Sequence, residues 1–381
     1  MSTGLRKTLF QRVTGAFIFI ILVAFILRVN VYRLGPYVDE QTYDWLEFNL
    51  SQGKLRTGSA YNDVYARYGA LDPNGGVDPW LDHPVLYPLI LGIVKAFFRF
   101  AFKTDIGLYG SRLTSILIFC LPAIYLAMIV CKKRYGTGPA VITGLTYAVA
   151  PSIVLMQQMV FLDQGVALFS MLSFFALAKH LDNGGLKWLV LSSIFAGSAS
   201  LCKGTGVFAI LAVVLTVIFS REFTVKKKVS KSFLALVVGG ALFSLYPLYG
   251  YLLNSQLLQA ISSAELSSHS IITEWLVRSM VEYPWNYQNA YDLFLLLGWI
   301  AVAYLLVKGL EDRQVEAPLI WLACYLAVLV FVAKTAYFYS QIVLYPFLSI
   351  AIGKMLFDVM VFVKRALYEN FQNRRAEDTG K

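Results

Sequence analysis

Charge, cysteine and histidine are all scarce in this chain. Of its 381 residues, 15% are charged, whereas 58% are hydrophobic and 15% are aromatic. Soluble domains carry about 25% charged residues, so an ordinary soluble protein is excluded. The chain has only three histidines and four cysteines, Cys120, Cys131, Cys202 and Cys324. Because these cysteines lie in or beside apolar runs, without the paired spacing of a zinc site, we interpret them as small hydrophobic residues.

The sequence consists largely of long apolar runs. They recur from Phe17 to Val363, and the mean hydropathy is +0.62. Each run is close to the ~20 residues that cross a hydrocarbon core of roughly 30 Å. The sequence therefore predicts a polytopic membrane protein. Since no small-residue cleavage site follows Leu27, we expect the first run to remain as a membrane span.

Basic residues set the expected orientation. The net charge is +10, and Lys and Arg gather at 6–12, 132–134, 221–231 and 364–375. This pattern is typical of cytoplasmic loops, so these clusters are expected inside, and no nucleic-acid partner is expected. The clusters can share one side only if residues 84–102 do not cross the membrane. That segment carries basic residues at helical spacing beside Leu, Ile and Phe, which predicts an interfacial helix.

The predicted fold class is an all-α polytopic membrane protein with about ten transmembrane helices and with interfacial helices in a long first external loop. One membrane domain is expected over residues 1–363, with external loops at 33–111 and 254–291. A basic cytoplasmic tail at 364–381 is expected to be disordered. The expected spans are 13–32, 108–131, 138–157, 164–180, 187–202, 205–220, 232–253, 291–307, 318–333 and 341–363.

The first external loop opens with two adjacent acids, Asp39 and Glu40, just after Pro36. Asp39 could simply cap a helix and complement its dipole. However, two carboxylates directly above an apolar span are costly to hold near the bilayer unless water, a cation or a substrate hydroxyl meets them. Asp39 is therefore a candidate functional acid.

A second group of polar residues, Asp78, Asp82 and His83, precedes the expected interfacial helix. Asp82 could cap that helix, with Pro84 in its first turn. Alternatively, His83 could face a phosphate, or the three side chains could offer oxygen and nitrogen ligands to a divalent cation. A metal requirement stays open at this point, and no other cofactor is expected.

Asp163 and Lys203 fall on the same expected external face. Each has an ordinary explanation, since an acid at a helix start is often a cap and a lysine at the end of a span often snorkels to the surface. Their coincidence with the acids of the first loop favours function. Gly204 and Gly206 would also let the backbone approach a ligand closely beside Lys203.

The order of these features resembles the protein O-mannosyltransferase family, which includes the bacterial transferases that add aminoarabinose to lipid A and belongs to the GT-C class of membrane glycosyltransferases. The resemblance covers most of residues 10–360. It rests on Asp39-Glu40, His83-Pro84-Val85-Leu86-Tyr87, Arg112-Leu113-Thr114-Ser115, Asp163, Lys203 and Leu344-Tyr345-Pro346-Phe347-Leu348.

The resemblance implies a GT-C-like bundle that transfers a sugar, with inversion, from a polyprenyl-phosphate donor to a hydroxyl acceptor on the non-cytoplasmic face. In the family an acid of the first external loop is the base; the family's acids match Asp39, Glu40 and Asp163. The family often carries a basic residue near the terminal Tyr-Pro motif. Here that loop offers Tyr337, Tyr339 and Gln341 instead, with Lys334 the nearest cation.

The chemistry needs a base for the attacking hydroxyl and positive charge for the departing phosphate. Asp39 suits the first task and Lys203 the second, with His83 and Arg112 as further candidates for phosphate binding. Aromatic side chains could contact the sugar or the acceptor. The candidates are Tyr283, Trp285, Tyr337 and Tyr339.

Two alternatives belong to other classes of protein. A lipid or sugar transporter, or flippase, would also be a bundle of this size, but such proteins usually bind near the bilayer midplane and often contain internal repeats, and no matching halves are evident. A noncatalytic scaffold would leave the polar residues unexplained. We therefore expect a glycosyltransferase in a bacterial or archaeal cell membrane, with its active site facing the periplasm or exterior and with the bilayer, a lipid-linked donor and a hydroxyl acceptor as partners.

Overall fold

The computed structural model describes residues 3–268, 293–333 and 338–379. Three of the expected contact residues, Tyr283, Trp285 and Tyr337, lie outside the described residues. The described chain is mostly helical, as expected. Its longer helices are α1 (Thr3–Arg28), α6 (Leu121–Tyr135), α7 (Thr137–Val149), α9 (Leu162–Asn183), α10 (Leu186–Cys202), α11 (Phe208–Phe219), α12 (Val225–Phe243), α13 (Leu245–Ser268), α16 (Phe294–Glu311), α17 (Ala317–Val328) and α18 (Tyr345–Thr379).

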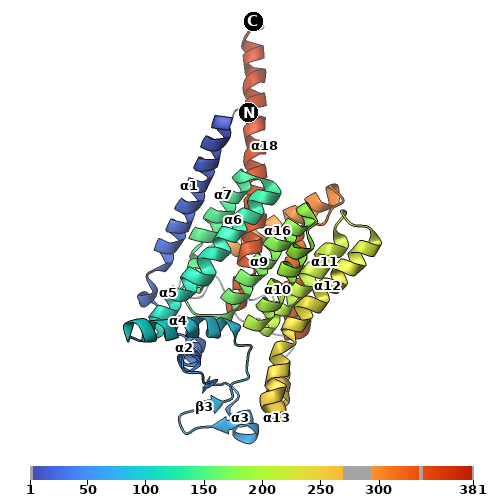
Figure 1. Ribbon diagram of the computed structural model, residues 1–381. Coiled ribbons are helices and arrows are strands. Elements are labelled where there is room, and N and C mark those ends of the chain that lie inside the picture. The colour runs from blue at the N-terminus through green and yellow to red at the C-terminus, as the bar shows by residue number, and fades with distance from the viewer. Residues whose placement is uncertain (1–2, 269–292, 334–337, 380–381) are drawn as a thin grey trace.

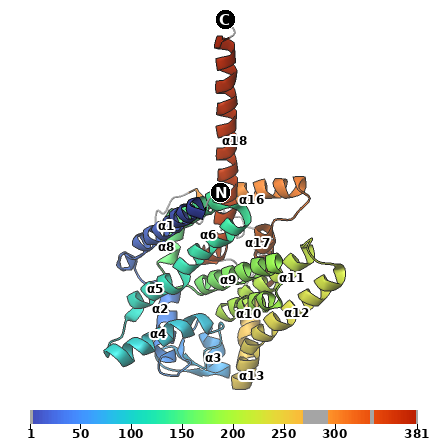
Figure 2. The same ribbon diagram turned by 45° about the horizontal axis from the view of Figure 1, so that its top comes forward.

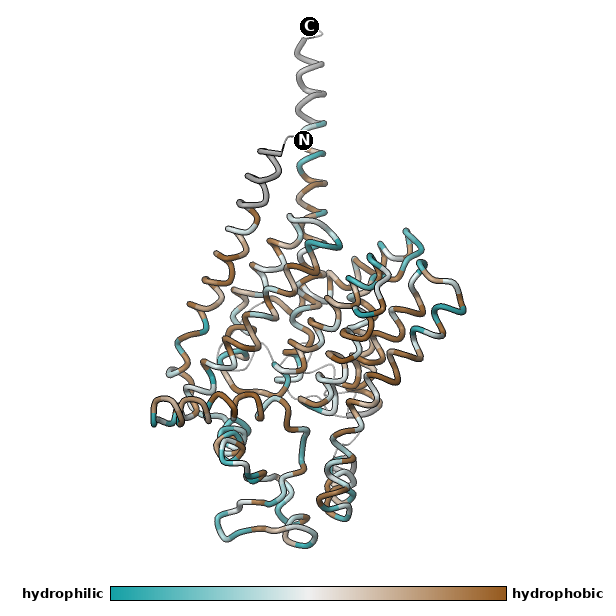
Figure 3. Tube along the Cα trace, in the orientation of Figure 1, coloured by the Kyte–Doolittle hydropathy of each residue, from teal (hydrophilic) through white to brown (hydrophobic). Residues whose placement is uncertain are grey.

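The apolar helices form one bundle, and polar segments gather at its two ends (Figures 1 and 3). Both termini lie at one end, and the segment expected to form the first external loop lies at the other (Figure 1). Shorter elements connect the bundle helices. They are α5 (Gly107–Ser115), the π-turn η2 (Ile116–Cys120), α8 (Pro151–Gln157), the 3-10 turns η3 (Gly204–Val207) and η5 (Phe338–Val343), and the π-turn η4 (Leu329–Ala333).

Five described helical segments are long and apolar enough to cross a membrane, and a sixth is counted if α7 and α8, bent by 62°, form one broken span. Pro151 explains the break, because proline lacks an N–H and disfavours helical geometry in the residue before it. Four shorter apolar helices cover the other expected spans: Val13–Arg28, Leu186–Cys202, Gly204–Phe219 and Ala317–Phe331. The protein is thus a multi-pass helical membrane protein, and the count of ten spans stays a prediction.

The segment expected to form the first external loop folds into a small layer below the bundle (Figure 1). It contains η1 (Val31–Arg33), α2 (Val38–Leu50), α3 (Asn62–Tyr68) and α4 (Leu86–Phe102). A short antiparallel sheet joins β1 (Thr57–Gly58), β3 (Gly76–Asp78) and β2 (Ala70–Leu71) in the order β1-β3-β2. Within this sheet, Val77 pairs with Thr57 on one side and with Leu71 on the other.

Helix α4, the segment 86–102 that we expect not to cross, lies across the ends of the bundle helices (Figure 1). One of its faces is exposed and apolar, with Ile93, Phe97 and Phe100 between 58% and 80% exposed. The opposite face packs on α2, where a side chain at Gly92 would meet the Glu47 carbonyl at 3.0 Å. This amphipathic pattern suits a helix at the membrane surface, and that location remains a prediction.

A buried charge network holds α4 against α2. Lys95 is 1% exposed, and its ammonium donates to the Asp44 carboxylate and lies 3.6 Å from Oε2 of Glu47. Ser111 of α5 donates to the same Glu47 oxygen at 2.6 Å. Burial raises the pKa of Glu47 to about 8, and Lys95 and Ser111 act in the opposite direction. Two acids therefore share one buried cation.

Helix α18 continues through the basic tail to Thr379, so the tail that was expected to be disordered is helical. Residues 364–379 are rich in Arg, Ala, Glu, Lys and Gln, which favour helix even without a packing partner. The helix projects away from the bundle at the end where the N-terminus lies (Figure 2).

We predict that Lys95→Ala destabilises the fold by about 3–5 kcal/mol, because it removes the buried cation shared by the fully buried Glu47 and the half-buried Asp44. Thermal unfolding of the detergent-solubilised protein measures the change. Lys54→Ala is the matched control: Lys54 is exposed, so its loss should cost less than about 0.5 kcal/mol. Equal stability of the two variants would contradict the role assigned to Lys95.

Candidate active site

The most deeply buried part of the site is an ion pair between Glu40 of α2 and Arg112 of α5. Both side chains are fully buried, and their charged atoms are joined at 2.9 and 2.6 Å. Arg112 also donates to three backbone carbonyls near the end of the first span, those of Val31, Leu34 and Gly35. All five N–H donors of a guanidinium are therefore used within the protein.

The Glu40 carboxylate is likewise fully hydrogen-bonded within the protein. Besides Arg112, it accepts hydrogen bonds from the backbone N–H of Val160 at 2.7 Å and of Tyr37 at 3.0 Å. The geometry therefore favours a positioning role for both residues over the catalytic role expected for Glu40 and the phosphate-binding role expected for Arg112. Arg112 has no donor left for a phosphate, and Glu40 has no access to a substrate.

Asp163 and Lys203 form a second ion pair, as their shared face suggested. Asp163 lies in the first turn of α9 and Lys203 directly follows α10, and Nζ of Lys203 is 2.8 Å from Oδ2 of Asp163. Asp163 is 1% exposed, whereas the Lys203 side chain keeps 13% of its surface. The lysine can therefore be reached from outside, and the acid serves to hold it.

Tyr339 of η5 brings the remaining expected residues together. Its ring stacks on Phe161 at 4.8 Å, with 22° between the planes. The Lys203 ammonium lies 4.7 Å from the same ring's centroid. The side chain of Tyr339 also hydrogen-bonds to Asp39, which lies in the first turn of α2. Four sites far apart in the sequence thus meet at the end of the bundle where α2 lies.

Asp39 is the half-buried acid of this cluster. Burial raises the pKa of Asp39 above its ordinary value, and the nearby charges of Asp163 and Glu40 act in the same direction. The hydrogen bond from Tyr339 and the positive charge of Lys203 oppose this rise. A carboxylate with a raised pKa is a better proton acceptor than an exposed aspartate, which suits a general base.

The residues proposed as metal ligands, Asp78, Asp82 and His83, do not form a cluster. The Asp82 carboxylate accepts hydrogen bonds from Ser59 at 2.6 Å and Tyr65 at 2.8 Å, and burial raises the pKa of Asp82 to about 6. His83 is half-buried with its ring edge-on to Trp80. Within the described ranges, no three His, Cys, Asp or Glu side chains are grouped for a metal ion, so Asp78, Asp82 and His83 lose support as ligands.

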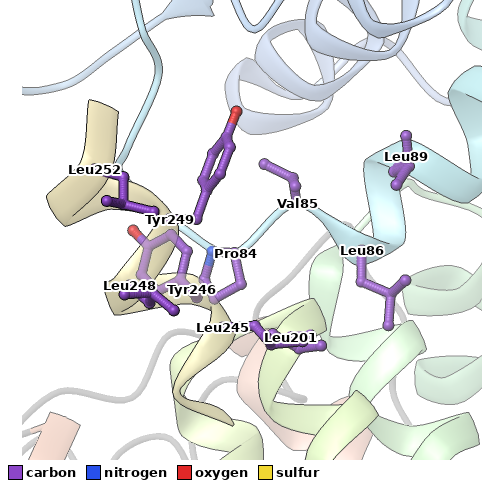
Figure 4. A pocket seen from close by; sticks show the side chains of 10 residues that line it. All are labelled: Pro84, Val85, Leu86, Leu89, Leu201, Leu245, Tyr246, Leu248, Tyr249 and Leu252. Atoms are coloured by element: carbon purple, nitrogen blue, oxygen red, sulfur yellow. The ribbon is translucent and has the colours of Figure 1, made fainter. Parts of the chain in front are cut away.

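An apolar groove of about 430 Å³ lies near the starts of α4 and α13 (Figure 4). The start of α4 forms one wall, and the start of α13 forms the other. Pro84 in the groove directly follows His83, and Leu201 in the groove precedes Lys203 by two residues. The groove is lined by Pro84, Val85, Leu86, Leu89, Leu201, Leu245, Tyr246, Leu248, Tyr249 and Leu252.

Two residues of this region, Phe161 and Glu265, are not among the site residues expected from the sequence. Phe161 supports Tyr339, but one phenylalanine among many apolar residues cannot be singled out. Glu265 near the end of α13 lies close enough to Asp82 and Lys203 to interact with both charges. A lone acid in the second external loop could have pointed to it.

Residues 82–248 match the family model of the dolichyl-phosphate-mannose-protein mannosyltransferases. The fold is similar to that of ArnT from Cupriavidus metallidurans bound to undecaprenyl phosphate, with a TM-score of 0.62 and 16% identity over 89% of this chain and 59% of that one. The resemblance to the GT-C membrane glycosyltransferases is confirmed. The matched stretch holds His83, Arg112, Asp163 and Lys203.

A second GT-C structure has the same fold. It is the oligosaccharyltransferase AglB from Archaeoglobus fulgidus in complex with an inhibitory peptide and a dolichol-phosphate, with a TM-score of 0.54 and 12% identity over 94% of this chain and 52% of that one. At these identities the likeness shows the fold alone. The chain spans about six tenths of the length of ArnT and half that of AglB. A comparison with curated proteins found no significant match.

We predict that Arg112→Met destabilises the fold by about 3–5 kcal/mol, because it leaves the Glu40 carboxylate buried without a counter-charge. The double variant Glu40→Gln, Arg112→Met should recover part of this loss. Thermal unfolding measures both, with the exposed Arg67→Met as the control. If Arg112→Met were as stable as the parent but bound a lipid phosphate more weakly, the phosphate-binding role would be restored.

Proposed function

We propose that this protein is an inverting glycosyltransferase that moves a sugar from a polyprenyl-phosphate donor to a hydroxyl acceptor on the non-cytoplasmic face of the membrane. The observation that carries the proposal is the meeting of Asp39, Lys203 and Tyr339 at one end of the bundle. A proton acceptor and an accessible cation thus lie in one cluster, on elements held by buried ion pairs. This is the minimum that the reaction requires.

In the proposed reaction, Asp39 removes the proton from the acceptor hydroxyl as its oxygen attacks the anomeric carbon. The bond between that carbon and the phosphate oxygen breaks, and polyprenyl phosphate leaves with the bonding electrons. Lys203 stabilises the charge that develops on this leaving group. The proton on Asp39 then passes to water, which restores the base. Attack from the side opposite the phosphate gives inversion.

The apolar groove supports a lipid-linked donor. Its lining residues lead on one side to His83 and on the other to Lys203, so an isoprenoid chain lying in the groove would bring its phosphate toward these two side chains. A lipid phosphate offers both an apolar chain and an anion, and the groove and Lys203 match these two requirements. His83 stays a candidate for the second phosphate contact.

The transporter alternative has less support. Asp163 lies in the first turn of a helix and Lys203 directly after the end of one, whereas transporters usually bind near the bilayer midplane at interrupted helices. The sugar and the acceptor remain to be identified. A labelled polyprenyl-phosphate sugar incubated with the purified protein tests the reaction class, since a transferase releases free polyprenyl phosphate.

Asp39→Asn should lower the rate by about a hundred- to ten-thousand-fold, because asparagine keeps the shape of the side chain but cannot accept the proton. Single-turnover release of polyprenyl phosphate from saturating donor measures this effect. The matched control is Asp63→Asn, an exposed position in α3. A folded Asp39→Asn variant that turns over within a few-fold of the parent would show that Asp39 is not the base, and Asp163 would then be tested.

Lys203→Ala should weaken donor binding by about ten-fold or more, because a charge-assisted contact to a phosphate is worth roughly 1.5–3 kcal/mol. Titration with undecaprenyl phosphate, followed by the rise in unfolding temperature, measures the affinity. Lys54→Ala controls for the loss of one external positive charge. Unchanged affinity in Lys203→Ala would leave the lysine as a snorkelling residue and would remove the phosphate site from this cluster.

A further inference from the structure

Contacts within the protein hold the Tyr339 side chain in one position. The side chain is 8% exposed, and its ring stacks on Phe161. Phe161 in turn contacts the edge of the Tyr37 ring and follows Val160, whose N–H is bound to Glu40. The segment that carries Tyr339 is also anchored from α17.

That anchor is the hydroxyl of Tyr325, which donates to the carbonyl of Ser340 at 2.8 Å. Both the ring of Tyr339 and the backbone beside it are therefore held in place before any substrate binds. The side chain has little freedom to adapt to a sugar.

Tyr339 touches both groups to which the proposed reaction assigns a task. Its side chain hydrogen-bonds to Asp39, and its ring lies under the Lys203 ammonium. Since a carboxylate can only accept, the hydroxyl is the donor in the first contact. Lys203 meanwhile donates to Asp163. One side chain thus links the candidate base to the candidate phosphate-binding cation.

We propose that Tyr339 is a positioning residue, which aims the Asp39 carboxylate with its hydroxyl and fixes the Lys203 ammonium with its ring. This inference rests on the proposed function, because it assigns Asp39 the role of base. It also replaces the sugar contact expected for Tyr339 from the sequence, since the hydroxyl is already engaged with Asp39.

The proposal predicts an effect on the protonation of the base. The charged groups that face Asp39 are Lys203, Asp163 and its neighbour Glu40. A hydrogen bond to the ionised form of an acid lowers its pKa, so removing the Tyr339 hydroxyl raises the pKa of Asp39. A base with a higher pKa is protonated, and therefore inactive, over more of the acidic range.

The first test is the pH dependence of kcat/KM for Tyr339→Phe, which keeps the ring and its stacking but lacks the hydroxyl. The acidic limb should move up by about one pH unit, as expected for one lost hydrogen bond. At high pH the activity should return to within about ten-fold of the parent, because Asp39 is then ionised in both proteins. Tyr304→Phe is the matched control and should leave the limb unchanged, because that hydroxyl donates to Asp358 of α18 and is not among the groups that act on Asp39.

A second variant keeps the test valid if Tyr339→Phe does not fold. Tyr339→3-fluorotyrosine retains the shape and the hydroxyl but is a stronger donor, so the acidic limb should move to lower pH. Opposite shifts in the two variants would establish the positioning role. A raised KM with an unmoved limb would overturn it in favour of a sugar contact, and an equal loss at every pH would overturn it in favour of a purely structural role.

The outcome separates this inference from the function on which it rests. If Asp39→Asn is inactive but neither Tyr339 variant moves the acidic limb, Asp39 remains the base and only the role of Tyr339 is lost. If Asp39→Asn stays active, the assignment of the base itself fails.

Discussion

The buried contact between Glu40 and Arg112 determines how the end of the bundle that carries α2 is assembled. In a low-dielectric interior neither charge is tolerated alone, so each fixes the other. Arg112 binds the carbonyls at the end of the first span, and Glu40 binds the N–H of Val160 just before α9. Three parts of the chain are thereby brought to one place. Asp39, the neighbour of Glu40, and Phe161, the neighbour of Val160, are placed by the same contact.

The charged residues at this end of the bundle fall into two groups that differ in their access to solvent. Glu40, Arg112 and Lys95 are fully enclosed, and their hydrogen bonds go to other parts of the protein. Asp39 and Lys203 keep part of their surface. The enclosed charges hold α2 and α5 against the bundle, so that Asp39 on α2 is rigidly presented, while Asp163 holds Lys203. A reaction that moves charge benefits from this, because preorganised groups need no rearrangement as the transition state forms.

Much of the site could be predicted because membrane sequences make polar residues conspicuous. Asp39, Asp163 and Lys203 are rare charges at the ends of apolar runs, where each needs an explanation. The same reasoning could not separate the roles of Asp39 and Glu40. Adjacent residues on a helix point about 100° apart, and only the packed structure shows that Glu40 faces inward. The sequence likewise assigns Arg112 to a phosphate, because neither its contact with Glu40 nor its bonds to backbone carbonyls can be read from a local pattern.

The sequence alone determined the membrane class and the segments that form the bundle, because hydropathy is a local property. The non-crossing geometry of residues 84–102 stays a prediction from the position of the basic residues. The sequence also determined which residues were candidates for the site. The tertiary structure decided which candidates face one another and that Tyr339 rather than Arg112 adjoins the accessible lysine. These features depend on contacts between residues as many as 300 positions apart, such as Asp39 and Tyr339, and no local pattern encodes such contacts.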